Sequence, residues 1–150
     1  MLRRDYDGQD CAVARTLEIV GERWTLLIVR DAFLGRNRFE QFQESLGIAR
    51  NVLTDRLNRL VDEGILERVR YSERPERFEY RLTPKGRDLR LTLTALRQWG
   101  EEHLGEAPRR TLQSVADGSR IVAGLVPADA EVLAADEVEL VAVAPPASPE

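Results

Sequence analysis

The chain has 150 residues, enough for one domain with a moderate core, and 43% of them are hydrophobic, which argues against a disordered chain. No apolar run reaches the roughly 20 residues of a membrane helix, and the first ten residues lack the apolar centre of a signal peptide. A cytoplasmic protein with no membrane partner is therefore expected. A single cysteine and a single histidine exclude an internal disulfide and leave no ligand set for structural zinc, so neither a metal nor a cofactor is expected.

The net charge of −4 is unevenly distributed along the chain. Residues 105–150 carry three arginines and eight acidic residues, a net charge of −5. Residues 36–90 carry thirteen basic and ten acidic residues, a net charge of +3. A phosphate backbone responds to local charge, so the acidic total does not exclude a nucleic-acid partner.

Two helices are predicted at the beginning of the chain. In "CAVARTLEIVGERW" the spacing of Ala14, Leu17, Ile19 and Val20 predicts a short amphipathic helix that ends near Gly21. Residues 23–35, "RWTLLIVRDAFLG", are apolar on almost every side of a helix. That pattern is typical of a central, buried helix, with a glycine as its stop.

A third and a fourth helix follow, joined by a turn at Gly47. Phe39, Phe42 and Leu46 lie at i, i+3 and i+7 in "RNRFEQFQESLGI" and predict the third helix. In residues 49–63 a buried stripe is predicted from Leu53, Leu57, Leu60 and Val61. Two short helices with a tight glycine turn form a helix-turn-helix pattern.

The opposite face of the fourth helix is rich in amides, arginines and a hydroxyl, the groups that hydrogen-bond base edges and phosphates. An ordinary surface helix is the alternative, although such helices favour glutamate and lysine. The candidate DNA-binding residues on this helix are Arg50, Asn51, Thr54, Asp55, Asn58 and Arg59.

A β-hairpin is predicted next. "ILERVRYSE" alternates as a strand does, "RPER" is the expected turn, and "FEYRL" returns as a second strand. A helix-turn-helix followed by such a hairpin is the order of a winged helix, whose wing reaches the DNA backbone or minor groove. Arg74 and Arg77 are therefore added to the DNA-binding candidates; a charged tip that serves only solubility is the alternative.

A long last helix is predicted from "LTPKG" to about Leu104, with Thr83 as its cap and Pro84 at its first position. Two neighbouring apolar stripes run along this helix, and together they are too wide to be covered by the wing alone. One reading is packing onto the first helix of the same chain, and the other is a homodimer interface. The candidate dimerisation residues are Leu89, Leu93, Leu96 and Trp99.

Residues 105–150 change in character. "GEAPRR" ends the helix, "SRIVAGLV" and "VELVAVA" predict strands with a third short strand between them, and "PPASPE" predicts a flexible end. The expected organisation is a winged-helix and dimerisation domain over residues 1–104 and a small β-ribbon extension over residues 105–150. The predicted class is α+β, a winged helix-turn-helix with dimerisation helices at both ends.

The segments "GERWTLLIVRD", "RFEQFQESLGIARNVLTDRLNRLVDEGILER", "YRLTPKG" and "LRQWG", with Cys11 before them, resemble the HxlR-type bacterial transcription regulators. The "GERW" motif, the "RF" pair that opens the third helix and the cysteine just before the first helix distinguish this pattern from MarR-type winged helices. The resemblance implies a homodimer that binds double-stranded operator DNA near regulated promoters, with a recognition helix at 49–63 and a wing at 65–82. A two-fold dimer predicts a pseudo-palindromic operator, and repression is the expected sign of regulation. The resemblance also adds Arg38, in the "RF" pair, to the DNA-binding candidates.

The chain departs from that family pattern in three places. Members often have a proline after the cysteine, where this chain has Ala12. They often have two prolines in the wing, where this chain has Pro75 followed by Glu76. Some relatives carry zinc-ribbon cysteines in a C-terminal extension, and this chain has none there.

Cys11 has two interpretations. In some relatives the matching cysteine senses oxidants or electrophiles, and the resemblance makes Cys11 a candidate redox sensor. Arg15 and the start of a helix favour a thiolate, whereas Asp5, Asp7 and Asp10 oppose it. The alternative is a small residue packed where two copies meet.

Three classes of function are compared. A sequence-specific DNA-binding regulator, with an unidentified small-molecule effector as a further partner, is favoured by the arginines and amides of the fourth helix and the wing. A winged helix that only binds other proteins is the second. An enzyme is not expected, because the lone His103 allows no Ser-His-Asp set, no catalytic residue is indicated, and no glycine-rich phosphate loop is present.

Overall fold

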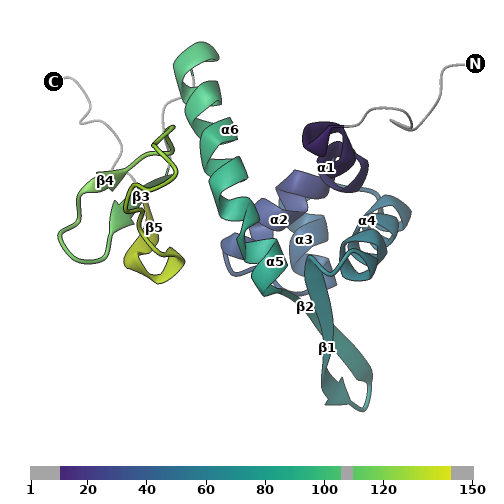
Figure 1. The fold of residues 1–150 in the computed structure, drawn as a ribbon. Helices are drawn as coiled ribbons and strands as arrows, with labels where there is room; N and C mark the ends of the chain where they lie inside the picture. Colours follow the sequence, from purple (N-terminus) through teal and green to yellow (C-terminus); the bar gives the residue numbers. More distant parts are fainter. Residues whose placement is uncertain (1–10, 106–109, 143–150) are drawn as a thin grey trace, which may run out of the picture. The chain divides into compact units, whose positions relative to one another are not determined.

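The computed structural model describes residues 11–105 and 110–142, which form two compact units that meet in the sequence between Arg90 and Leu91. The first unit is an α+β winged helix (Figure 1), as the sequence predicts. It contains α1 (Ala12–Val20), α2 (Thr25–Phe33), α3 (Phe39–Leu46), α4 (Arg50–Asp62), β1 (Leu66–Glu73), β2 (Glu76–Leu82) and the short α5 (Pro84–Arg87). No helix in these described ranges is long and apolar enough to cross a membrane.

The second unit holds most of α6 (Leu89–His103) and a small sheet. Its strands are β3 (Arg110–Ser114), β4 (Arg120–Ile121) and β5 (Val138–Ala142), and a 3-10 turn, η1 (Ala135–Glu137), precedes β5. The boundary between the two units, after Arg90, lies earlier in the chain than residue 104, where the sequence predicted the end of the first domain. The assignment of α6 to a winged-helix dimerisation domain remains a prediction.

The core of the first unit lies between α2, α3, α4 and the base of the hairpin. The leucine stripe predicted for α4 is confirmed, since Leu53, Leu57 and Leu60 are all fully buried, while Val61 is only half-buried. Their neighbours in this core are Ile28, Val29, Phe42, Ile65 and Leu66. Because one face of α4 is used in this packing, its opposite face is left to solvent.

The turn between α3 and α4 has the predicted glycine at its start. Gly47 caps α3 with a φ of 61°, in the left-handed region that favours glycine. Ala49 is the N-cap of α4 and has no side chain able to cap, so the first amide groups of α4 are not covered by a cap side chain. The short connection fixes α4 beside α3, as a helix-turn-helix requires.

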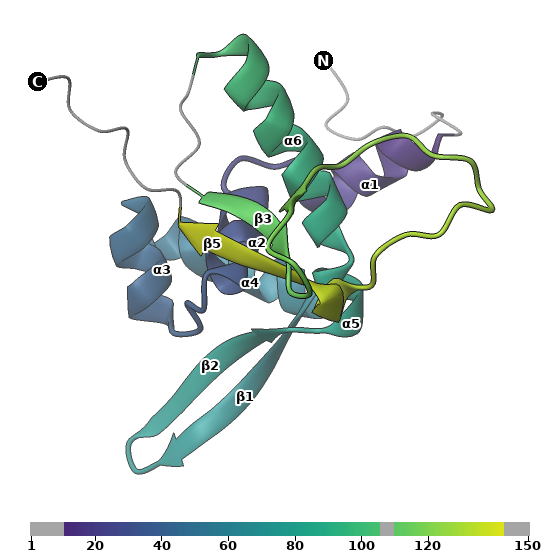
Figure 2. The same cartoon turned by 90° about the vertical axis from the view of Figure 1, so that its left-hand side faces the viewer.

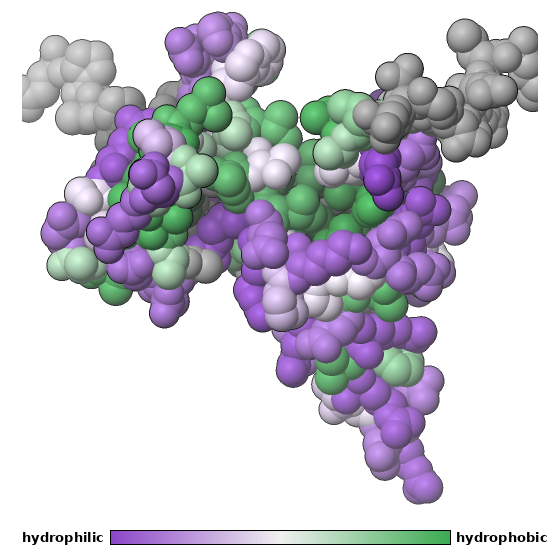
Figure 3. All heavy atoms as spheres, viewed as in Figure 1, coloured by the Kyte–Doolittle hydropathy of each residue, from purple (hydrophilic) through white to green (hydrophobic). Residues whose placement is uncertain are grey.

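The hairpin β1–β2 is antiparallel, from the pair Leu66 and Leu82 at its base to Glu73 and Glu76 beside its tip. The tip is only Arg74–Pro75, so the predicted four-residue turn "RPER" is wrong: Glu76 and Arg77 belong to β2. The hairpin projects from the helices in two views (Figures 1 and 2). In the space-filling view its surface, at the lower right, is mainly hydrophilic (Figure 3).

The base of the hairpin is bound to the α3 region by a hydrogen bond and a ring contact. The Tyr80 amide donates to the Asn37 carbonyl at 2.7 Å, just before α3 begins. The Phe42 and Tyr80 rings meet edge to face with centroids 6.5 Å apart. The hairpin therefore starts from a fixed position relative to α3 and α4.

The predicted "LTPKG" helix start is confirmed. The Thr83 hydroxyl accepts from the Gly86 amide at 3.1 Å, and Pro84 occupies the first helical position. The single long helix predicted from this point is wrong, because α5 ends at Arg87 and α6 begins at Leu89. Gly86 is buried, and a Cβ atom there would collide with the Ile65 carbonyl oxygen.

The sheet of the second unit has the order β4-β3-β5. Its central strand, β3, was not predicted, and the strand predicted over residues 119–126 is reduced to β4. Beyond Ile121 the chain is irregular up to η1, and Pro127 in this stretch has no backbone N–H group to donate to a neighbouring strand.

The Gln98 side chain of α6 is joined to this sheet region by two hydrogen bonds to the Ala123 backbone, at 3.0 and 2.5 Å. The end predicted to be flexible, 145–150, lies outside the described residues.

Candidate DNA-binding surface

The outer face of α4 presents most of the predicted readout residues to solvent. Arg50, Asn51, Thr54, Asp55 and Asn58 are all exposed. The Thr54 hydroxyl donates to the Arg50 carbonyl at 2.9 Å, so this side chain lies along its own helix. The remaining side chains keep donors and acceptors that can meet base edges in a major groove.

Arg59 is placed differently from the rest of the predicted set. Its Nη2 lies 3.2 Å from a Glu63 carboxylate oxygen and 3.4 Å from the Glu18 carbonyl oxygen. The neighbouring Arg56 forms an ion pair with Glu22, just after α1. These two arginines attach α4 to the α1 region, and a DNA contact by Arg59 remains a prediction.

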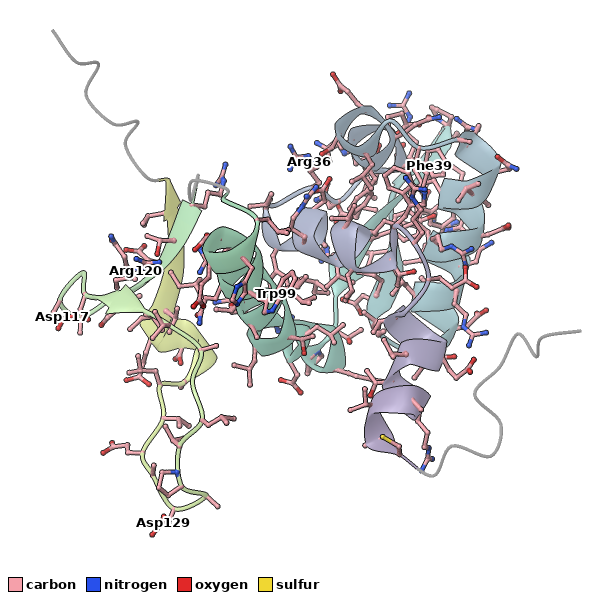
Figure 4. The ribbon with its side chains drawn as sticks, turned by 90° about the horizontal axis from the view of Figure 1, so that it is seen from above. Arg36, Phe39, Trp99, Asp117, Arg120 and Asp129 are labelled. Carbon is pink, nitrogen blue, oxygen red and sulfur yellow. The ribbon has the colours of Figure 1, made fainter. Side chains whose placement is uncertain are left out.

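A cleft of about 670 Å³ lies between the starts of α3 and α4 and the inner side of the hairpin. Four arginines line it: Arg38 before α3, Arg50 on α4, and Arg68 and Arg77 on the two strands. The rings of Phe39, Tyr71 and Phe78 also line it, and Phe39 is labelled at the start of α3 in Figure 4. We call this feature the arginine–aromatic cleft.

Three of the cleft arginines stack on aromatic rings. The guanidinium carbon of Arg38 lies 4.6 Å from the centroid of the Tyr71 ring, and that of Arg50 lies 4.7 Å from Phe39. Arg68 makes the closest stack, 3.7 Å from the centroid of Phe78. Such cation–π contacts hold a guanidinium in place without neutralising its charge.

The arginines outside the cleft are mostly paired with carboxylates. Arg30 lies 2.8 Å from Asp31, and Arg70, on the same strand as Arg68, pairs with Glu73 at 3.7 Å and Glu76 at 3.4 Å. Among the described residues no ion pair joins a carboxylate to any of the four cleft arginines, Arg38, Arg50, Arg68 and Arg77. Glu40 and Glu76 also border the cleft, but its balance is basic.

Sequence reasoning identified Arg38, Arg50 and Arg77 but missed Arg68 and all three rings. Arg74, also predicted, is exposed at the tip of the hairpin and lies outside the cleft lining. The alternation of arginine with aromatic residues in "ERVRYSERPERFEY" was the available signal. This alternation did not show which ring each arginine would contact, because Arg38 and Arg50 lie outside the hairpin.

The predicted dimerisation residues lie along α6. Leu89 and Leu93 are half-buried, whereas Leu96 is 52% exposed and Trp99, labelled in Figure 4, is 57% exposed. Leu91 on the same helix is 66% exposed. Several large apolar side chains exposed along one helix are typical of a protein–protein interface. The dimer itself remains a prediction.

Cys11 is the N-cap residue of α1 and is exposed. The backbone amides of Ala14 and then Val13, which point toward the thiol from the first turn of α1, lower its pKa, although neither of them forms a capping hydrogen bond to the side chain. A helix start favours the thiolate for this reason. The opposing aspartates that the sequence suggested, Asp5, Asp7 and Asp10, lie outside the described residues.

Comparisons with known proteins agree with this geometry. A family model described as HxlR-like helix-turn-helix matches residues 19–108. The HTH-type transcriptional regulator Rv3095 of Mycobacterium tuberculosis is 52% identical over 103 residues, which cover 69% of this chain and 64% of that protein. The chain thus matches just under two thirds of the length of this relative.

Two solved structures extend the comparison. PA1607, described as a candidate transcription factor, has a TM-score of 0.71 and 42% identity, covering 87% of this chain and 93% of that one. The redox regulator HypR in its reduced form has a TM-score of 0.60 and 30% identity, covering 63% of this chain and 94% of that one. With its winged helix and its matched family model, the chain belongs to the HxlR-like helix-turn-helix family.

Proposed function

We propose that this chain is a transcription regulator that binds double-stranded DNA at specific sequences. The observation that carries the proposal is the exposed hydrogen-bonding face of α4, fixed by its buried leucines beside a cleft of unpaired arginines. In this arrangement α4 enters a major groove and the hairpin reaches the neighbouring backbone or minor groove. Asn51, Asp55 and Asn58 supply the base readout, while Arg38, Arg50, Arg74 and Arg77 add affinity.

We further propose that the active form is a homodimer on a pseudo-palindromic operator. The exposed apolar residues of α6, including Leu96 and Trp99, supply the interface. Two-fold symmetry in the protein is mirrored by two half-sites in the DNA. Binding at such a site within a promoter excludes the polymerase, which makes repression the expected sign of regulation.

A gel shift tests the function. The purified chain is titrated against the promoter fragment of its own gene and against an unrelated fragment of equal length, in the same salt. The proposal expects a shift of the promoter fragment that unlabelled unrelated DNA does not abolish. Equal, weak binding to both fragments would contradict sequence-specific readout, and no binding to either would favour a protein-interaction module.

Redox sensing through Cys11 is the second candidate. It is supported by the similarity to the redox regulator HypR and by an exposed thiol whose pKa is lowered at the start of α1. If it is correct, diamide weakens operator binding by the wild-type protein, dithiothreitol restores it, and Cys11→Ser binds alike under both conditions. An oxidant effect of equal size in Cys11→Ser would remove the cysteine from the mechanism.

A further inference from the structure

We propose that the arginine–aromatic cleft is a binding site for the sugar–phosphate backbone of one DNA strand, with Arg68 as one of its phosphate-binding residues. The proposal also makes Phe78 a positioning residue, which acts by holding the Arg68 guanidinium. It rests on the proposed function and adds to it a specific place for the backbone. Neither Arg68 nor Phe78 was among the residues that the sequence suggested for DNA binding.

Charge is the first argument. Arg38, Arg50, Arg68 and Arg77 converge on one cleft from four separate places in the chain. None of them has a carboxylate partner among the described residues, whereas Arg70 on the same hairpin has two. Unpaired guanidinium groups gathered in this way leave a site for an anion with several oxygens.

The stacked geometry is the second argument. A guanidinium that a cation–π contact holds over a ring has no carboxylate on its N–H donors, so these donors can form the paired hydrogen bonds that a phosphate accepts. The ring also limits the rotamers of a long side chain, so less side-chain entropy is lost on binding. Arg68, at 3.7 Å from the Phe78 centroid, is the most closely stacked of the three.

The position of the cleft points to a DNA strand as its occupant. Arg50 belongs both to the cleft and to the first turn of α4, so a strand bordering the groove that α4 enters passes this point. Guanidinium groups lie over three of the rings that line the cleft, which favours an anionic occupant over a small hydrophobic ligand. Free phosphate shares the phosphate chemistry and is tested separately below.

The experiment measures the affinity of the full chain for its operator and for an unrelated duplex by fluorescence anisotropy over a series of salt concentrations. Arg68→Ala should weaken binding to both duplexes by the same factor and reduce the slope of log affinity against log salt by about one unit. Arg70→Ala is the matched control, because that guanidinium is on the same strand but is already paired. Its slope should equal that of the wild type.

Phe78→Leu tests the positioning role. It removes no charge, so the salt slope should stay unchanged while affinity falls roughly two- to fivefold, the weight of an exposed cation–π contact. In the Arg68→Ala background the same change should have no further effect, because the group that the ring positions is gone. If Phe78→Leu does not fold, Arg68→Lys replaces it and should lower affinity with an unchanged slope, since the charge stays and the planar fork of donors over the ring is lost.

Three results would overturn the inference. If Arg68→Ala binds DNA as Arg70→Ala does while the wild type binds its operator, the cleft is not a backbone site and the proposed function stands. If Phe78→Leu weakens binding equally in both backgrounds, the ring does not act through Arg68. If inorganic phosphate binds the free protein and Arg68→Ala removes that binding while its DNA affinity and salt slope stay at the wild-type values, the cleft is a site for free phosphate and not for DNA. Failure of the wild type to bind any DNA would remove the proposed function together with the inference.

Discussion

Gly86 allows α5 to pack closely against the base of the hairpin because it has no Cβ atom. It is buried where α5 crosses the base of the hairpin, and a Cβ there would collide with the Ile65 carbonyl oxygen and lie 3.0 Å from Leu82 Cδ2. Backbone cannot move aside as a flexible side-chain end can. The glycine of "LTPKG" is therefore required by this close approach between α5 and the hairpin.

We predict that Gly86→Ala lowers the free energy of unfolding by about 1–3 kcal/mol, the usual cost of overpacking. Gly100→Ala is the control, because its Cβ would meet nothing nearer than Leu104 Cδ1 at 3.9 Å. That change, inside α6, should instead stabilise by up to about 1 kcal/mol. Urea unfolding of the three proteins measures both effects, and equal stability of Gly86→Ala and the wild type would refute the packing argument.

The Cys11 thiol gives a prediction in pH. The backbone amides at the start of α1 lower its pKa, and the thiolate is the form that reacts with iodoacetamide. A lowered pKa means that the thiolate appears at a lower pH, so the rise in alkylation rate with pH should have its midpoint below that of the same protein unfolded in urea. A midpoint at or above the unfolded value would contradict the described geometry of Cys11.

At the scale of elements, α4 has two polar sides with different roles. One side carries Arg56 and Arg59, which are bound to Glu22 and to the Glu18 carbonyl in or next to α1. The other side carries Asn51, Asp55 and Asn58, which are exposed. The helix is thus fixed on one side by α1 and beneath by its leucines, and only the remaining side is available to a partner.

We expect Asn51→Ala to cost about 1–3 kcal/mol in operator binding and to relax the preference at one base position. Arg59→Ala, whose guanidinium already has protein partners, should change base preference less. Binding assays over a set of singly substituted operators compare the two variants. A larger loss of preference in Arg59→Ala than in Asn51→Ala would mean that the α1 side of the helix faces the DNA.

The elements that the sequence predicted well are those whose cause is local. The leucine repeat of α4 and the Thr83 cap each depend on residues a few positions apart, and both are confirmed. Strand β3 was missed because "RTLQS" contains a single apolar residue, so this strand depends on its partners β4 and β5 and has no alternating apolar pattern of its own. The stacks in the cleft were missed for a similar reason, since Tyr71 meets Arg38 only after the hairpin folds back.

At the scale of the whole molecule, the assembly depends on α6. Leu96 and Trp99 are exposed in the chain alone, which is unfavourable unless another surface covers them. We expect Leu96→Glu to give a folded monomer at micromolar concentration with much weaker operator binding, because the linkage between half-sites is lost. Sedimentation velocity measures the assembly, and Val132→Glu, which changes another exposed apolar residue of the second unit, should stay dimeric. A wild-type monomer with full operator affinity would exclude this interface.

Hydroxyl-radical footprinting of the wild-type protein on its operator shows directly whether the protein binds DNA as a homodimer with two recognition helices. A homodimer that places one α4 helix in each of two successive major grooves should protect two patches of backbone on one face of the duplex. Their centres should lie about 10–10.5 base pairs apart, or a multiple of that spacing. A single protected patch at full affinity, or uniform cleavage at a protein concentration that saturates the gel shift, would contradict the account.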